Sequence, residues 1–184
     1  MEPGLWVERV GDRVFAADAP ALFLDRDGTV NVDTGYPGDP DGIVLLDDIV
    51  PLIAAANARA MPVVIVTNQS GIARGYFGWG DFAAVNRRVL HLLEEKGASV
   101  DMVVACAYHE AGEGGLRAAD HPMRKPNPGM LLVAAKRLGI DLKRSVIVGD
   151  KPSDLEAGRR AGLARGFLFD PAAQPLDPQS VLGG

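Results

Sequence analysis

Short, mainly apolar runs alternate along the chain with longer segments in which apolar residues recur every three or four positions. The short runs are too brief for helices and carry few polar interruptions, which predicts strands buried on both faces. They lie at 21–24, 62–66, 102–106, 145–148 and 166–169. The longer segments predict helices that pack one face against a core. They lie at 49–60, 81–96, 129–138 and 154–161. Asp47 or Asp48 is expected to cap the first helix, with Pro51 in its first turn.

The alternation of strands and helices predicts an α/β fold, a three-layer sandwich around a parallel sheet. We expect one domain over residues 21–170. Residues 1–20 hold two apolar patches on either side of Gly11-Asp12, which favours a strand or small hairpin that extends the core. Residues 171–184 contain three prolines and end in Gly-Gly, which predicts a loose tail.

Composition narrows the class of protein. The chain has 184 residues, 47% of them hydrophobic and 23% charged, which is typical of a globular protein. Its net charge is −5 and its basic residues are scattered, so we expect no nucleic-acid partner. One cysteine excludes an internal disulfide and suits a reducing compartment. With neither a signal peptide nor ~20 consecutive apolar residues, the sequence predicts a cytoplasmic protein without membrane contact.

The first predicted core strand leads directly into Asp25-Arg26-Asp27-Gly28-Thr29. If the strand geometry persists, the carboxylates of Asp25 and Asp27 project to the same side and repel each other. A hard divalent cation with oxygen ligands, Mg²⁺ above all, would neutralise them. The alternative is a surface turn with solvated carboxylates.

Polar residues also follow the other strands. Thr67 and Asn68 end the second strand, Lys125 precedes the third helix, and Asp150 and Asp154 follow the fourth strand. Because ligands of open α/β sheets bind beyond the carboxyl ends of the strands, these side chains predict one site for a phosphate and a metal. Each has an ordinary alternative: helix capping for Thr67 and Asn68, a solvated Lys125, and a turn with an N-cap at 150–154.

Four motifs resemble those of the haloacid dehalogenase superfamily of phosphatases. They are Asp25-Arg26-Asp27-Gly28-Thr29, Thr67-Asn68, Lys125-Pro126 and Gly149-Asp150-Lys151-Pro152-Ser153-Asp154. The longer runs at 25–31, 67–75 and 124–130 resemble the D-glycero-D-manno-heptose 1,7-bisphosphate phosphatases and the phosphatase domain of histidinol-phosphate phosphatase. This resemblance implies a Rossmann-like core with a minimal cap domain or none.

The resemblance also implies a role for each matching residue. Asp25 would be the nucleophile that forms an aspartyl-phosphate, and Asp27 the general acid and base. Phosphate binding falls to Thr67, Asn68 and Lys125. Metal binding falls to Asp25, Asp27 through its carbonyl, Asp150 and Asp154, with Mg²⁺ as the ion. Substrate contacts are expected from Asn31, Gln69, Ser70, Arg74 and Arg124.

One part of the family pattern is degenerate. Many members of the heptose and histidinol-phosphate group carry a zinc loop, Cys-x-His early and Cys-x-Cys just before Arg-Lys-Pro. Here the early pair falls on Cys106 and Tyr108, and the later pair on His121 and Met123. Tyrosine and methionine are poor zinc ligands, so the loop is predicted to lack zinc, although Cys106, His109 and His121 remain as candidate ligands together with Glu110 or Asp120.

The sequence therefore predicts an Mg²⁺-dependent phosphomonoesterase that acts as a monomer on a small phosphorylated sugar or metabolite, most specifically a heptose 1,7-bisphosphate. Two alternatives stay open. One is a phosphatase for histidinol phosphate or another small ester, which a substrate panel distinguishes. The other is a catalytically silent phosphosugar-binding protein, which intact catalytic residues argue against.

Overall fold

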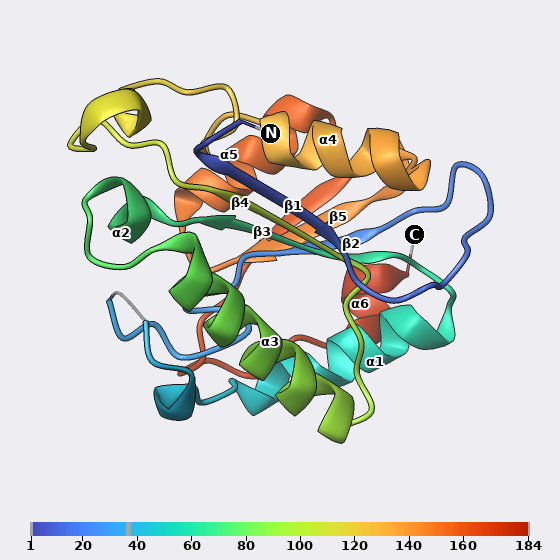
Figure 1. The fold of residues 1–184 in the computed structure, drawn as a ribbon. Coiled ribbons are helices and arrows are strands. Elements are labelled where there is room, and N and C mark those ends of the chain that lie inside the picture. Colours follow the sequence, from blue (N-terminus) through green and yellow to red (C-terminus); the bar gives the residue numbers. More distant parts are fainter. Residues whose placement is uncertain (1, 36–37, 184) are drawn as a thin grey trace.

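The strands of the computed structural model lie in one sheet, in the order β1-β4-β3-β2-β5-β6 (Figure 1). The structure describes residues 2–35 and 38–183. The strands are β1 (Leu5–Arg9), β2 (Leu22–Leu24), β3 (Val63–Asn68), β4 (Met102–Cys106), β5 (Val146–Gly149) and β6 (Arg165–Leu168). All neighbours run parallel except β1, which pairs antiparallel with β4. The carboxyl ends of the parallel strands therefore share one edge of the sheet.

Helices cover both faces of this sheet (Figure 1). They are α1 (Val50–Ala58), α2 (Ser70–Ala73), α3 (Trp79–Glu95), α4 (Gly129–Leu138), α5 (Pro152–Ala161) and α6 (Pro178–Leu182). Short 3₁₀ turns lie at Pro40–Gly42, Asp47–Ile49, Gly114–Leu116 and Leu142–Arg144. Helices α1, α3 and α6 pack on one face, and α4 and α5 pack on the other. The predicted three-layer α/β sandwich is confirmed.

The alternation of side chains along β2 divides the core into two clusters. Leu22 and Leu24 pack with Ile53 and Phe82 on the face of α1 and α3, whereas Phe23 packs with Met130 on the face of α4. Residues 22–24 are wholly buried, because β2 lies between β3 and β5 and is covered on both faces. The strand that precedes Asp25 is therefore held on every side.

The N-terminal segment contains a strand but no hairpin. Residues 5–9 form β1, as the first apolar patch predicted. The second patch does not pair with it: Gly11 adopts a positive φ of 67°, and the chain turns away from the sheet. The exposed side chain of Val14 shows the result. The described part of this segment thus extends the sheet with an edge strand, one of the two predicted forms, and the second patch does not complete a hairpin.

Helix α1 begins without the predicted cap. Asp47 and Asp48 lie in a 3₁₀ turn, and the N-cap position is Ile49, which makes no side-chain capping bond. Pro51 stands in the first turn and has no backbone N–H, so one of the donors that a cap would satisfy is missing.

The C-terminal segment is ordered in a place where a loose tail was predicted. Asp177 caps α6 by accepting bonds from the backbone N–H groups of Gln179 and Ser180. Val181 is buried against the α1 side of the core. Arg165 donates to the carbonyls of Ser180, Val181 and Gly183. Pro178 thus starts a short helix that packs on the core, and the prediction of a loose tail is wrong for residues 178–182.

No helix in the described ranges is long and apolar enough to span a membrane.

Burial of Val181 predicts that α6 contributes to stability. Val181→Asp places a carboxylate in the apolar core, so we expect the free energy of unfolding to fall by about 3 kcal/mol. Urea denaturation followed by circular dichroism measures it. Gln179→Glu, on the exposed side of the same helix, is the control and should change stability by less than about 0.5 kcal/mol. Equal stability of the two variants would show that α6 does not support the core.

Candidate active site

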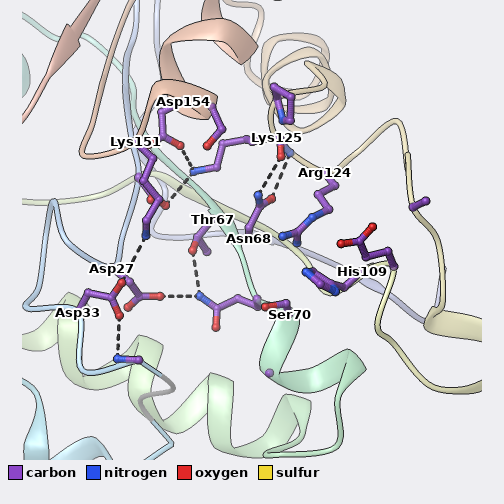
Figure 2. Close-up of a pocket in the computed structure, with 18 of the residues that line it drawn as sticks. Asp27, Asp33, Thr67, Asn68, Ser70, His109, Arg124, Lys125, Lys151 and Asp154 are labelled. Carbon is purple, nitrogen blue, oxygen red and sulfur yellow. Dashed lines mark hydrogen bonds and ion pairs between the residues drawn. The ribbon is translucent and has the colours of Figure 1, made fainter.

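A cavity of about 570 Å³ opens at the carboxyl ends of β2 and β3 and at the start of α5. It brings together nine of the predicted site residues, as Figure 2 shows for most of them. These are Asp25, Asp27, Thr67, Asn68, Gln69, Ser70, Arg124, Lys125 and Asp154. The chain segments that meet there are far apart in sequence, so the convergence comes from the parallel sheet.

Three carboxylates meet beside this cavity. One oxygen each from Asp25, Asp150 and Asp154 lies within 4.8 Å of the others. A buried Oδ1 of Asp150 has no hydrogen-bond partner among the described residues. Gly28 allows this approach, because it has a φ of 88° and a Cβ there would lie 2.5 Å from Asp150 Oδ2. Oxygen donors in this arrangement, one of them orphaned, fit a hard divalent cation such as Mg²⁺.

Lys125 is the buried counter-charge of this cluster. Its Nζ lies 2.8 Å from Asp25 Oδ1 and 2.6 Å from Asp154 Oδ1, and it donates to the Val66 carbonyl at 2.7 Å. Burial lowers the pKa of Lys125, but the two carboxylates outweigh this effect and raise it. Burial and Asp154 raise the pKa of Asp25 to about 6 against the opposing effect of Lys125. The lysine thus stays charged beside the nucleophile candidate.

Asn68 holds the backbone of Lys125. Its Nδ2 donates to the Lys125 carbonyl, and its Oδ1 accepts from the Lys125 N–H, both at 3.1 Å. The Lys125-Pro126 peptide bond is cis. This use of the amide favours a positioning role for Asn68, in place of the direct phosphate contact that the sequence predicted.

The side chain of Asp27 lies apart from the three-carboxylate cluster. Strand β2 ends at Leu24, so the argument that Asp25 and Asp27 project to the same side does not apply. Arg26 donates to Asp27 through Nε at 3.0 Å and Nη2 at 2.9 Å. Asn31 donates at 3.1 Å and Gln69 at 2.8 Å. Burial raises the pKa of Asp27, but these donors, Arg26 first, outweigh it and lower the pKa below its usual value.

Arg26 is a site residue that the sequence reasoning missed. Its side chain is wholly buried, and its guanidinium also lies over the ring of Phe82, 5.1 Å from the centroid. A buried arginine needs a specific partner, and Asp27 supplies it. The signal that was available is the position of a basic residue between two motif aspartates.

Gln69 connects Asp27 to Thr67. Its Nε2 donates to Asp27 Oδ2 at 2.8 Å and to Thr67 Oγ1 at 2.9 Å (Figure 2). Because an ionised carboxylate only accepts, the amide nitrogen must face Asp27, and the Thr67 oxygen must then accept as well. The proton of the Thr67 hydroxyl is left to donate into the cavity. Gln69 and Asn31, predicted as substrate contacts, therefore bind the acid–base candidate in this structure.

The cavity lining also includes side chains of the 107–124 loop. Arg124 and His109 are among them, and Figure 2 shows the two side chains close together. Arg124 Nη1 donates to the Tyr108 carbonyl at 3.2 Å. Arg74 contacts His109, with 3.2 Å between Arg74 Nη2 and His109 Nε2. Ser70 begins α2 at the rim. Arg124 and Ser70 thus both line the cavity, and their contact with a substrate stays a prediction.

The candidate zinc ligands are buried or contact other side chains. Cys106 is wholly buried in β4, and burial raises the pKa of its thiol to about 11. His109 contacts Arg74, and His121 stacks on Tyr108. Among residues 2–35 and 38–183, the potential metal ligands whose atoms all lie within 4.8 Å of one another are those of Asp25, Asp150 and Asp154. Cys106, His109 and His121 form no such group there. A loop without zinc stays a prediction.

Comparisons with known proteins agree with this geometry. The model of the haloacid dehalogenase-like hydrolases matches residues 6–162. A protein from Mesorhizobium japonicum, named D-glycero-beta-D-manno-heptose-1,7-bisphosphate 7-phosphatase, is 64% identical over 99% of this chain and 88% of its own. A Burkholderia mallei protein named as the corresponding alpha-anomer phosphatase is 41% identical over 81% of this chain and 79% of its own.

Solved structures show the same likeness. A haloacid dehalogenase-like phosphatase from Mesorhizobium loti is 68% identical, with a TM-score of 0.90 over 91% of this chain and 80% of that one. The D,D-heptose 1,7-bisphosphate phosphatase of B. bronchiseptica, solved with magnesium and phosphate, is 33% identical, with a TM-score of 0.68 over 79% and 78%. The chain thus belongs to the haloacid dehalogenase-like hydrolases, and the prediction that it is an enzyme, a phosphatase of this family, is confirmed.

Proposed function

We propose that this enzyme removes the 7-phosphate of D-glycero-β-D-manno-heptose 1,7-bisphosphate with the help of Mg²⁺. The observation that carries the chemistry is the convergence of Asp25, Asp154 and Lys125 on one cavity, with Asp150 beside the two aspartates. The identity of 64% to a relative named for the β-anomer supports the choice of sugar. The magnesium and phosphate bound by the B. bronchiseptica enzyme support the choice of metal.

Asp25 is the nucleophile of the proposed reaction. Its carboxylate oxygen attacks phosphorus, the bond from phosphorus to the sugar oxygen breaks, and an aspartyl-phosphate forms. Water then attacks that phosphorus and releases inorganic phosphate with Asp25 restored. Lys125 and the free proton of the Thr67 hydroxyl stabilise the phosphoryl oxygens in both steps.

Asp27 transfers the protons. It donates to the sugar oxygen as that oxygen leaves, and it later accepts a proton from the attacking water. At rest, Arg26 and its other donors keep this carboxylate ionised and fixed. The negative charge of an arriving phosphate favours protonation of Asp27, which is the state that the first step needs.

Asp25, Asp150 and Asp154 would hold Mg²⁺ together with the backbone carbonyl of Asp27. The ion supplies positive charge that offsets the repulsion between a carboxylate nucleophile and a phosphate dianion.

We further propose that the enzyme acts in the cytoplasm, as a monomer, on a small phosphorylated sugar. The single cysteine, which is free and buried, suits a reducing compartment.

Replacing the nucleophile should abolish turnover. Asp25→Asn keeps the size of the side chain and removes the attacking carboxylate, so we expect kcat to fall at least about 1000-fold. Phosphate release from the heptose bisphosphate measures it. Asp33→Asn changes another carboxylate that lines the same cavity and should alter kcat by less than about threefold. Substantial activity in Asp25→Asn would refute the assignment.

Metal removal and metal analysis should show that activity depends on Mg²⁺ and that the protein holds no zinc. Because three carboxylates need a counter-ion for phosphate to approach, we expect EDTA to stop turnover and excess Mg²⁺ to restore it. Metal analysis of protein purified without a histidine tag should find no stoichiometric zinc. Full activity in EDTA would argue against the magnesium site, and one zinc per chain would contradict the prediction for the 106–124 loop.

A substrate panel decides the sugar. We expect kcat/KM for the β-anomer of the heptose 1,7-bisphosphate to exceed that for the α-anomer and for histidinol phosphate by roughly tenfold or more. Coupled phosphate detection with Mg²⁺ present gives the comparison. A higher kcat/KM for histidinol phosphate would leave the chemistry intact and overturn the proposed substrate.

A further inference from the structure

We propose that Glu2, Tyr108 and His121 form a metal-free clasp that fixes the 107–124 loop and aims Arg124 at the sugar phosphate. The three act as positioning residues for substrate binding, through Arg124. This inference rests on the proposed function, because it assumes that Arg124 at the cavity rim contacts the substrate.

The two ends of the loop are joined by a ring stack. The ring centroids of Tyr108 and His121 lie 3.7 Å apart, and the ring planes are inclined by 13°. Tyr108 is buried and the side chain of His121 is 18% exposed. Stacking of two rings at the start and end of an irregular segment ties that segment across its base.

Glu2 closes the clasp with its carboxylate. His121 Nε2 lies 3.0 Å from Glu2 Oε1, which ties the N-terminal segment to the imidazole that stacks on Tyr108. His121 Nδ1 accepts the N–H of Met123 at 3.2 Å, so the proton of a neutral imidazole is on Nε2 and is directed at Glu2. Burial and Glu2 raise the pKa of Tyr108, which keeps its hydroxyl a donor.

The backbone near Glu2 is anchored, so the carboxylate is not on a free end. Gly4 packs directly on the Tyr108 ring: a Cβ at Gly4 would lie 2.5 Å from a ring carbon. The Gly4 carbonyl accepts the N–H of Ala107 at 2.8 Å, and the Pro3 carbonyl accepts Trp79 Nε1 at 2.9 Å. The N-terminal segment is therefore part of the wall that supports the loop.

Both halves of the stack hold Arg124. The Tyr108 carbonyl accepts Arg124 Nη1 at 3.2 Å, which fixes the guanidinium. The His121 carbonyl accepts the Arg124 backbone N–H at 2.9 Å and Asn127 Nδ2 at 3.1 Å. Arg124 is thus held at both ends by the two residues whose rings stack, and it is the residue before Lys125 of the catalytic site. Loosening the clasp should displace Arg124 more than any catalytic carboxylate.

The test uses Tyr108→Leu, which removes the stack and the hydroxyl, and Glu2→Ala, which removes the carboxylate. Losing the aligned guanidinium should raise KM for the heptose bisphosphate roughly tenfold and leave kcat within about twofold. Hydrolysis of p-nitrophenyl phosphate, which has no sugar for Arg124 to contact, should stay within about twofold. Hydrogen exchange of the amides of residues 109–124 should accelerate about tenfold.

His91→Ala and Glu95→Ala break a similar but exposed pair on α3, 3.5 Å apart, and serve as matched controls that should change neither readout. Wild-type KM or wild-type loop exchange in both clasp variants overturns the proposal. If Tyr108→Leu unfolds globally, Glu2→Ala decides alone, since that side chain is 42% exposed. If the wild-type enzyme does not hydrolyse the heptose bisphosphate, the proposed function fails, and loop exchange still decides whether the clasp exists.

Discussion

Charge balance around a buried ammonium is the constraint on which the site depends. Lys125 lies between the carboxylates of Asp25 and Asp154, and all three side chains are buried from bulk water. A buried carboxylate without a cation would lose its charge and with it its nucleophilicity. Two neighbouring residues support this balance: Asn68 holds the backbone of the lysine, and Gly28 lets Asp150 approach.

A second charge pair is kept separate from the first. Arg26 binds Asp27 through two hydrogen bonds, whereas Lys125 pairs with Asp25, so the two aspartates of one motif have different partners. Burial raises the pKa of both carboxylates, but Arg26 and the other donors outweigh it at Asp27, so the pKa of Asp25 is raised and that of Asp27 is lowered. Environments that differ in this way are what allow two identical side chains to perform two different roles.

The sequence predicted those parts of the fold and site that periodicity or a motif encodes. Apolar runs located the strands, and the motifs located Asp25, Lys125 and Asp150 at one edge of the sheet. It could not show that β3 continues through polar Thr67 and Asn68, since pairing with β4 maintains the strand there. The partners of Arg26 and Gln69, and the stack of Tyr108 on His121, depend on side-chain directions, which no spacing reports.

Strand β2 is only three residues long, yet it is enclosed by a neighbour on each side and by helices above and below. Local opening of a protein begins at edges and termini, which here are β1, β6 and α6, and reaches the centre last. Asp25, the proposed nucleophile, directly follows this strand and is thus attached to the part of the molecule that we expect to open last. The outer strands can therefore open locally while Asp25 keeps its position at the end of β2.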